Sequence, residues 1–225
     1  MLCAKPQYRG HCAGSMLGVT AAVTPKGERR RHALVSAAAE LLCEGGFDAV
    51  RHRAVARRAG LPLASTTYYF SSLDDLIVKA VEHVGVQEAA QLRLRLDHLS
   101  RRRRGAESTA DVLVDLLVGE RPTLHLSEQL ISRYERYIAC ARLPGLRDVQ
   151  RRIRAQRSAA VVEAVERSGR SVCAERLTAL LCAVDGALVS ALVDDGGSPR
   201  ETARATLVDV IDVLAPTDRR PMAAY

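Results

Sequence analysis

Apolar residues recur along this chain at the three- and four-residue spacing of amphipathic helices, and beyond the first 70 residues no stretch alternates as a strand would. Caps, glycines and prolines divide the chain into about nine helices. A long helix is expected from about 72 to 99. The helices after it are expected at 109–119, 127–142, 146–168, 173–193 and 199–214. The pattern predicts an all-α protein.

The segment 51–70 has the pattern of two short helices joined by a tight turn. Gly60 comes where the first helix must stop, because only glycine enters a left-handed C-cap without steric penalty. Pro62 suits the first turn of the next helix, expected at 63–69. The first helix has an apolar stripe, Val50, Ala54, Val55 and Ala59, and a basic face, Arg51, Arg53, Arg57 and Arg58. We interpret the segment as a helix-turn-helix whose second helix enters a major groove.

The motifs over 33–76 match a known family. ALVSAAAELLCEGGFDAV, VARRAG, TTYYF and SSLDDL, in this order, resemble the N-terminal DNA-binding domain of the tetracycline-repressor (TetR) family of transcriptional regulators. The resemblance implies a dimeric repressor that binds double-stranded DNA at a palindromic operator and leaves it when a small molecule binds the variable C-terminal domain. We expect a disordered arm over 1–24, a three-helix DNA-binding domain over 25–71, and a helical ligand-binding and dimerisation domain over 72–225.

The family's DNA contacts carry over residue by residue. The positions that match base-contacting positions of the family are Arg53, Leu63, Ala64, Ser65 and Thr67. Arg53 is the strongest candidate for reading guanine, because its planar fork fits the O6/N7 pair. The sequence departs from the family at Arg51, where a capping Ser or Thr is usual, at Thr67, where Tyr is common, and at Leu73, where Lys is common. We therefore expect Asp48 to cap the second helix, and phosphate contacts from Tyr68, Tyr69, Ser71 and Ser72.

Positive charge is concentrated at the N-terminal end. Residues 1–70 contain ten Lys and Arg against four Asp and Glu, whereas the two kinds nearly balance from residue 105 onward, and the whole chain has a net charge of +7. This asymmetry suits a protein with one face on a polyanion. The cluster Lys26, Arg29, Arg30 and Arg31 is a candidate for flanking phosphates. The run at 101–105, RRRRG, is either a solvated loop or a second phosphate patch.

The remaining apolar residues are interpreted as core. Phe47 and Phe70 are expected to close the small core of the three-helix DNA-binding domain. At least one of Tyr68 and Tyr69 should be exposed, since neighbours on a helix point about 100° apart. The most apolar run, 177–193, is interrupted by Asp185, so we interpret it as a buried helix and expect no membrane association. A cytoplasmic protein is expected.

The last two helices are predicted to form the dimer interface. Each has an apolar stripe: Leu177, Leu181, Val184, Leu188 and Leu192 on one, and Ala203, Leu207, Val210, Ile211 and Leu214 on the other. Such spacing packs four helices around a two-fold axis. The alternative is that these stripes form the core of a single subunit.

Ligand-binding candidates lie on two helices of the C-terminal part: Arg133, Tyr134, Tyr137, Cys140 and Asp185. Asp185 is either a ligand contact or a structural ion-pair member, and Arg133 or Arg136 is the expected partner, because a buried unpaired charge costs several kcal/mol. The many Leu, Val and Ala residues in these helices favour an apolar effector.

The six cysteines lack the paired spacing of a zinc site, and no cofactor or metal is predicted. Cys43 is expected in the core. Two alternatives to a ligand-controlled repressor remain at this stage. One is a redox-responsive regulator using Cys140, Cys173 and Cys182. The other is a helical enzyme with its substrate in the C-terminal cavity, against which the chain offers no nucleophile triad, phosphate loop or paired carboxylates.

Overall fold

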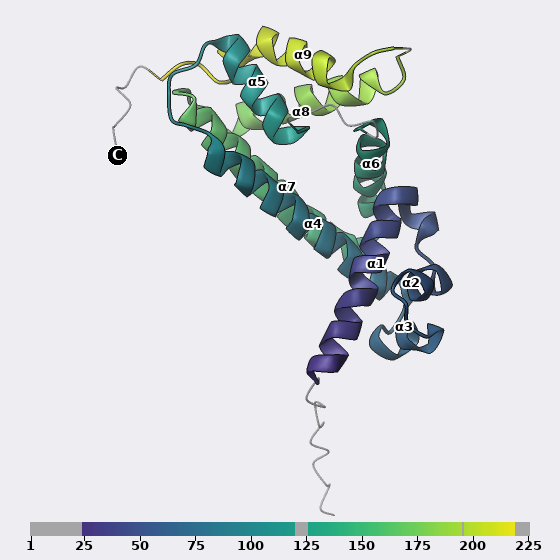
Figure 1. The fold of residues 1–225 in the computed structure, drawn as a ribbon. Coiled ribbons are helices and arrows are strands. Elements are labelled where there is room, and N and C mark those ends of the chain that lie inside the picture. The colour runs from purple at the N-terminus through teal and green to yellow at the C-terminus, as the bar shows by residue number, and fades with distance from the viewer. Residues whose placement is uncertain (1–23, 120–125, 195, 219–225) are drawn as a thin grey trace, which may run out of the picture.

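The computed structural model describes residues 24–119, 126–194 and 196–218, and over these ranges it contains nine helices and no strand. The prediction of an all-α protein is confirmed (Figure 1). The helices are α1 (Pro25–Ala49), α2 (His52–Arg58), α3 (Leu63–Tyr69), α4 (Leu73–His98), α5 (Ala106–Leu117), α6 (Leu126–Arg142), α7 (Pro144–Arg167), α8 (Ala174–Ala191) and α9 (Pro199–Leu214).

The chain's capping residues place several of these boundaries. Ser72 accepts a hydrogen bond from the Asp75 amide and caps α4, as predicted. Pro62 is the N-cap of α3 and not a residue of its first turn. Thr24 caps α1, whereas the rest of the predicted arm, 1–23, lies outside the described residues.

One apolar core joins the first three helices, α1 to α3, which we call the head, to the remaining helices, α4 to α9, which we call the body. It contains Leu34 of α1, Val55 of α2 and Phe70, the residue after α3, together with the first half of α4 and Leu146 and Val149 of α7. Phe70 is almost fully buried and Phe47 packs against the same cluster, so both are core residues as predicted. Because this core is continuous, α4 and α7 hold the head firmly against the body.

A second core lies at the other end of α4 and α7. Residues of α5, α7, α8 and α9 form it, with Leu96 of α4 and Leu130 of α6 at its edge. Figure 1 shows α4 and α7 running side by side between the two cores, with α6 beside α1 on the remaining side.

The predicted dimer stripes lie mostly inside one subunit. Six of their ten residues are buried in the second core: Leu181, Val184, Leu188, Ala203, Leu207 and Ile211. The alternative, core packing within one chain, is therefore correct for them, because α5 and α7 cover this face of α8 and α9. The exposed face of α8 is a neighbouring stripe of smaller residues at three- and four-residue spacing: Ala179, Cys182, Gly186 and Val189, continued by Val193 just after the end of the helix.

The basic run at 101–105 is only partly exposed, so neither a fully solvated loop nor a continuous phosphate patch describes all of it. Arg101, Arg102 and Arg103 are exposed, but Arg104 is buried. Its guanidinium donates to the main-chain oxygens of Ser100, Arg102 and Arg167. Arg104 therefore holds the loop against the end of α7.

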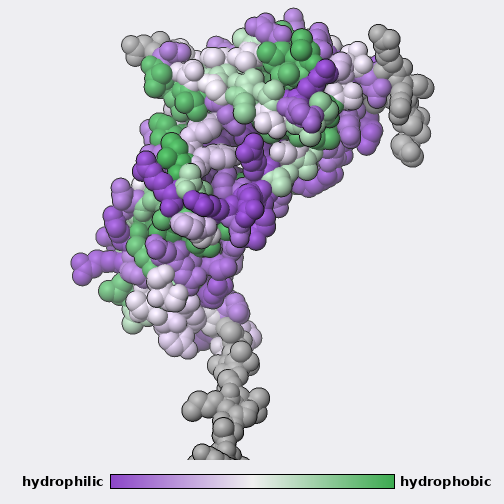
Figure 2. Space-filling view, turned by 180° about the vertical axis from the view of Figure 1, so that it is seen from behind, coloured by the Kyte–Doolittle hydropathy of each residue, from purple (hydrophilic) through white to green (hydrophobic). Residues whose placement is uncertain are grey.

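Figure 2 shows apolar side chains exposed on the uppermost layer of the molecule and polar side chains over much of its middle. None of the described helices combines the length and the apolar content that a membrane span requires.

Candidate functional site

The turn between α2 and α3 has the geometry that Gly60 predicted. Gly60 has a φ of 64°, and the Leu61 amide donates to the Ala56 oxygen at 3.0 Å, which closes the end of α2. Helix α3 then turns one face outward. Thr66 is buried, whereas Leu63, Ala64, Thr67 and Tyr68 are exposed and Ser65 is half-buried.

The two tyrosines divide as predicted. Tyr68 is 81% exposed, whereas Tyr69 is half-buried and packs against the head core. Their rings meet edge to face with centroids 4.8 Å apart. Tyr68 is therefore the one whose hydroxyl reaches freely into solvent.

The arginines of α2 fall into two groups. Arg51 pairs with Asp48 at 3.1 Å, and Arg58 pairs with Glu40 and Glu44 of α1. Arg53 and Arg57 are exposed and have no ion pair among the described residues. Of the arginines between positions 51 and 58, only these two therefore offer a guanidinium without a carboxylate partner to a polyanion.

Two expectations about this segment change with the ion pairs. Asp48 does not cap α2, which has no side-chain cap, because its carboxylate accepts from Arg51. Arg58 was expected on a phosphate-facing surface but instead joins α2 to α1, and its hydrogen bond holds the pKa of the Glu44 carboxyl below the ordinary value.

The start of α4 uses its own hydroxyls. The Ser71 amide and hydroxyl both donate to Asp75 at 3.3 and 3.4 Å, and Ser72 serves as the cap. At the start of α1, Lys26, Arg29 and Arg30 are exposed, while the Arg31 guanidinium lies 5.4 Å from the centre of the Phe70 ring.

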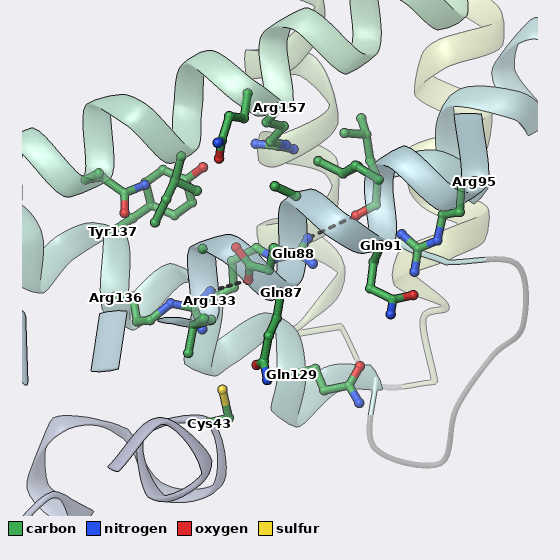
Figure 3. A pocket seen from close by; sticks show the side chains of 18 residues that line it. Cys43, Gln87, Glu88, Gln91, Arg95, Gln129, Arg133, Arg136, Tyr137 and Arg157 are labelled. Atoms are coloured by element: carbon green, nitrogen blue, oxygen red, sulfur yellow. Dashed lines mark hydrogen bonds and ion pairs between the residues drawn. The ribbon is translucent and has the colours of Figure 1, made fainter. Parts of the chain in front are cut away.

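A cavity of about 270 Å³ lies between α4, α6 and α7 (Figure 3). Of the five predicted ligand residues, Arg133 and Tyr137 line it. Its wall combines aliphatic side chains, Val84, Leu92, Leu117 and Ile153, with polar ones that the sequence analysis did not select: Gln87, Glu88, Gln91, Arg95, Gln129, Arg136, Gln150, Gln156 and Arg157. These polar residues are spread over three helices, so no local pattern marks them in the sequence.

Gly85 makes room where α4 crosses α7. A Cβ at this position would lie 2.5 Å from Cγ1 of Ile153, so only glycine permits the observed approach. Gly85 and Ile153 both line the cavity. The close crossing therefore defines one side of its wall.

Asp185 is a structural ion-pair member. Both of its carboxylate oxygens accept from Arg157, at 2.7 and 2.9 Å, and the Tyr134 hydroxyl donates to it at 3.0 Å. The expected partners, Arg133 and Arg136, were wrong, because Arg157 of α7 lies closer to α8. Burial alone lowers the pKa of Arg157, but the hydrogen bonds that it donates to Asp185 raise that pKa above the ordinary value. Burial and Asp185 together raise the pKa of Tyr134. Neither Asp185 nor Tyr134 lines the cavity.

Two cysteines lie differently from their expected places. Cys140 is buried behind the cavity, where its thiol donates to Gln150 at 3.7 Å and burial raises its pKa. Cys43, expected in the core, is exposed on the cavity wall. Cys173 and Cys182 are nine residues apart on or next to α8, which separates them by roughly 13 Å, beyond the reach of a disulfide.

Helix α6 contacts the head and the cavity at the same time. Arg133, Arg136 and Tyr137 line the cavity, while Ser132 is buried and donates to the Leu42 oxygen of α1 at 3.2 Å. The next turn also meets α1, since a Cβ at Gly46 would lie 2.8 Å from Oε2 of Glu135. A shift of α6 would therefore displace the residues near the end of α1 that it contacts.

Family models match two parts of the chain. Residues 34–80 match the model described as bacterial regulatory proteins of the tetR family, and residues 104–213 match the tetracyclin repressor-like C-terminal domain. The chain belongs to the TetR family of transcriptional regulators. It is thus a transcriptional regulator with a DNA-binding domain, and the alternative of a helical enzyme is wrong, because this is not an enzyme family.

Solved structures of TetR-like regulators have the same fold. The multidrug binding protein EbrR in complex with proflavin is 28% identical with a TM-score of 0.60, and the match covers 81% of this chain and 99% of that one. The TetR family member SCO1917 from Streptomyces coelicolor A3 is also 28% identical, with a TM-score of 0.57 and coverage of 80% and 97%. A transcriptional regulator from Saccharomonospora viridis in complex with choline shares the fold at 19% identity, with a TM-score of 0.66 and coverage of 85% and 100%. No curated protein matches the chain. Within the described residues of this TetR-family chain, no group of three metal-ligating side chains is placed to hold an ion.

Proposed function

We propose that this TetR-family regulator is a cytoplasmic repressor that binds a palindromic operator as a homodimer and leaves it when a small molecule occupies the cavity between α4, α6 and α7. The observation that carries the proposal is the double role of α6, which lines the cavity and bonds to α1 of the head through Ser132. Occupation of the cavity would thereby change the position of the head.

The head is proposed to read DNA through α3 and Arg53. Base edges would be met by Arg53, Leu63, Ala64, Ser65 and Thr67, and phosphates by Tyr68, Tyr69, Ser71 and Ser72. The exposure of most of these residues and the absence of a carboxylate partner for Arg53 among the described residues support this assignment. The charges of Asp74 and Asp75 lie beside Ser71 and Ser72, so Tyr68 is the stronger phosphate contact of the four.

The dimer is proposed to form through the exposed faces of α8 and α9. On α8 this face contains Gly186 and Val189, with Val193 just after the end of the helix, and on α9 it contains Val213, which is 69% exposed. Apolar residues exposed in a row on adjacent helices mark an interaction surface. A two-fold axis here would set the two heads about 34 Å apart, or a multiple of it.

The effector is proposed to bind with an apolar body against Val84, Leu92 and Ile153. EbrR, which shares the fold at 28% identity, is described in complex with proflavin and with ethidium, so a similar protein binds organic molecules with aromatic rings. The redox alternative has less support, because Cys140 is buried with a raised pKa.

The test is selection of bound fragments from the source genome, followed by titration of the enriched duplex. A palindromic site bound by two subunits, with affinity that falls steeply with salt, is expected. A monomer that binds random duplex equally well would refute the proposal.

A further inference from the structure

The cavity wall has an unbalanced charge that points to the chemical class of the effector. Four of its lining residues are arginines and one is a glutamate, and this inference rests on the proposed function of the cavity as the effector site. Two of the arginines already have carboxylate partners. Arg136 pairs with Glu88 across α6 and α4, and Arg157 pairs with Asp185.

Arg133 differs from these two. It is half-buried on α6, and its Nη1 donates to the main-chain oxygen of Leu117, the last residue of α5, at 3.1 Å. No carboxylate of the described residues forms an ion pair with it. A cation that is partly removed from water and bonded to a neutral carbonyl gains from an anion beside it. One bond to Leu117 leaves several of its N–H donors for such a partner.

Neutral hydrogen-bonding groups line the same cavity as Arg133. Gln87 and Gln91 of α4, Gln129 of α6, and Gln150 and Gln156 of α7 also line the cavity. Figure 3 shows Gln87, Gln91 and Gln129 together with Arg133 among the side chains that line the cavity. Carboxamides donate hydrogen bonds to an anion and add no compensating negative charge.

We propose that the effector is an organic anion, a carboxylate with an apolar body, whose charged group binds Arg133 and whose body lies against the aliphatic wall. A carboxylate suits the guanidinium fork of Arg133. Cations are disfavoured, because they would enter a wall that already has more arginine than glutamate. In this respect the chain differs from the structures of similar fold described with choline and with ethidium.

Three probes that share one ring system test the charge preference. They are 1-naphthoate, the neutral 1-naphthamide and the cation 1-naphthylmethylammonium, each titrated into the full chain by isothermal calorimetry. We expect naphthoate to bind about tenfold to a hundredfold more tightly than the amide, as one charge-assisted hydrogen bond allows, and the cation to bind most weakly. Equal affinities, a preference for the cation, or naphthoate binding weaker than millimolar would each overturn the inference.

Substitutions identify the residue responsible. Arg133→Gln should weaken naphthoate binding far more than amide binding and so remove most of the preference for naphthoate, while Arg133→Lys should retain part of it. Arg151→Gln is the matched control, because Arg151 is an exposed arginine of α7 that pairs with Asp148 and does not line the cavity. If Arg133→Gln weakens all three probes equally, Arg133 supports the cavity and does not bind the anion.

The probe titrations contain no DNA, so their outcome is independent of the operator experiment. If the affinities do not fall from naphthoate through the amide to the cation while operator binding is intact, only the anionic effector is rejected. If the affinities do fall in this order but the chain binds no operator, the proposed function is rejected and the preference of the cavity for an anion still holds.

Discussion

At the scale of single residues, Arg53 is the side chain that we propose to contribute most to sequence reading of DNA. Its neighbours Arg51 and Arg58 are engaged with Asp48 and with Glu40 and Glu44, whereas Arg53 is exposed without such a partner among the described residues. Arg53→Ala should weaken binding to the selected operator by about 1–3 kcal/mol and relax selectivity at one base pair in each half-site. Mobility-shift titrations on operator and single-base variants measure both effects. An equal loss on random duplex would show that Arg53 contacts only phosphate.

Gly85 is the second residue whose effect can be predicted, and here two effects oppose each other. Gly85→Ala gains about 1 kcal/mol of helix propensity but places a methyl group 2.5 Å from Ile153, and overpacking of this kind costs about 1–3 kcal/mol. The net result should be a loss of stability in chemical denaturation. In an Ile153→Ala background the same change should stabilise the protein, because the obstructing atoms are gone. A loss of equal size in both backgrounds would contradict the steric explanation.

At the scale of elements, the contact between α1 and α6 is the point where the cavity meets the head. Ser132→Ala removes the hydrogen bond to Leu42 and should lower the free energy of unfolding by about 1 kcal/mol. Hydrogen exchange should become faster in the last turns of α1 and stay unchanged in α9, which belongs to the other core. A uniform change along the whole chain would mean that this bond does not act locally.

The two apolar cores give the elements different freedoms. Helices α4 and α7 contribute to both cores, so they form a rigid connection, whereas α6 contributes mainly single residues such as Leu130 and Cys140. A helix with few buried apolar residues has less packing to lose when it moves. This is the physical reason to assign the moving part of the response to α6 and not to α7.

At the scale of the whole molecule, the exposed stripe of α8 predicts how two chains meet. Val189→Glu places a charge in the middle of this stripe, where burial without a partner is costly, and should convert the dimer to a monomer in sedimentation velocity. Operator affinity should fall with it, since two linked heads bind more tightly than one. Val86→Glu is the control, because Val86 is 67% exposed, against 45% for Val189, but lies on α4. Equal dissociation by both variants would show that α8 is not the interface.

The sequence determined the elements and the head. Helical spacing, the glycine turn at Gly60 and the aromatic run ending at Phe70 are local patterns, and the structure has the helices and the turn where these patterns predicted them. Local chemistry also predicted the Ser72 cap, because a cap and its helix are neighbours in the chain. These features depend on residues a few positions apart, so one sequence contains what is needed to predict them.

Only the tertiary structure decided which face of each element is buried and which charges meet. The Leu181 and Leu207 stripes are apolar at the correct spacing for a dimer, but α5 and α7 cover them within one chain. Asp185 pairs with Arg157, 28 residues away, and Arg58 pairs with Glu44 of another helix. The polar lining of the cavity comes from helices far apart in sequence. Pairings of this kind depend on how helices cross, and the spacing of residues along one helix does not contain that information.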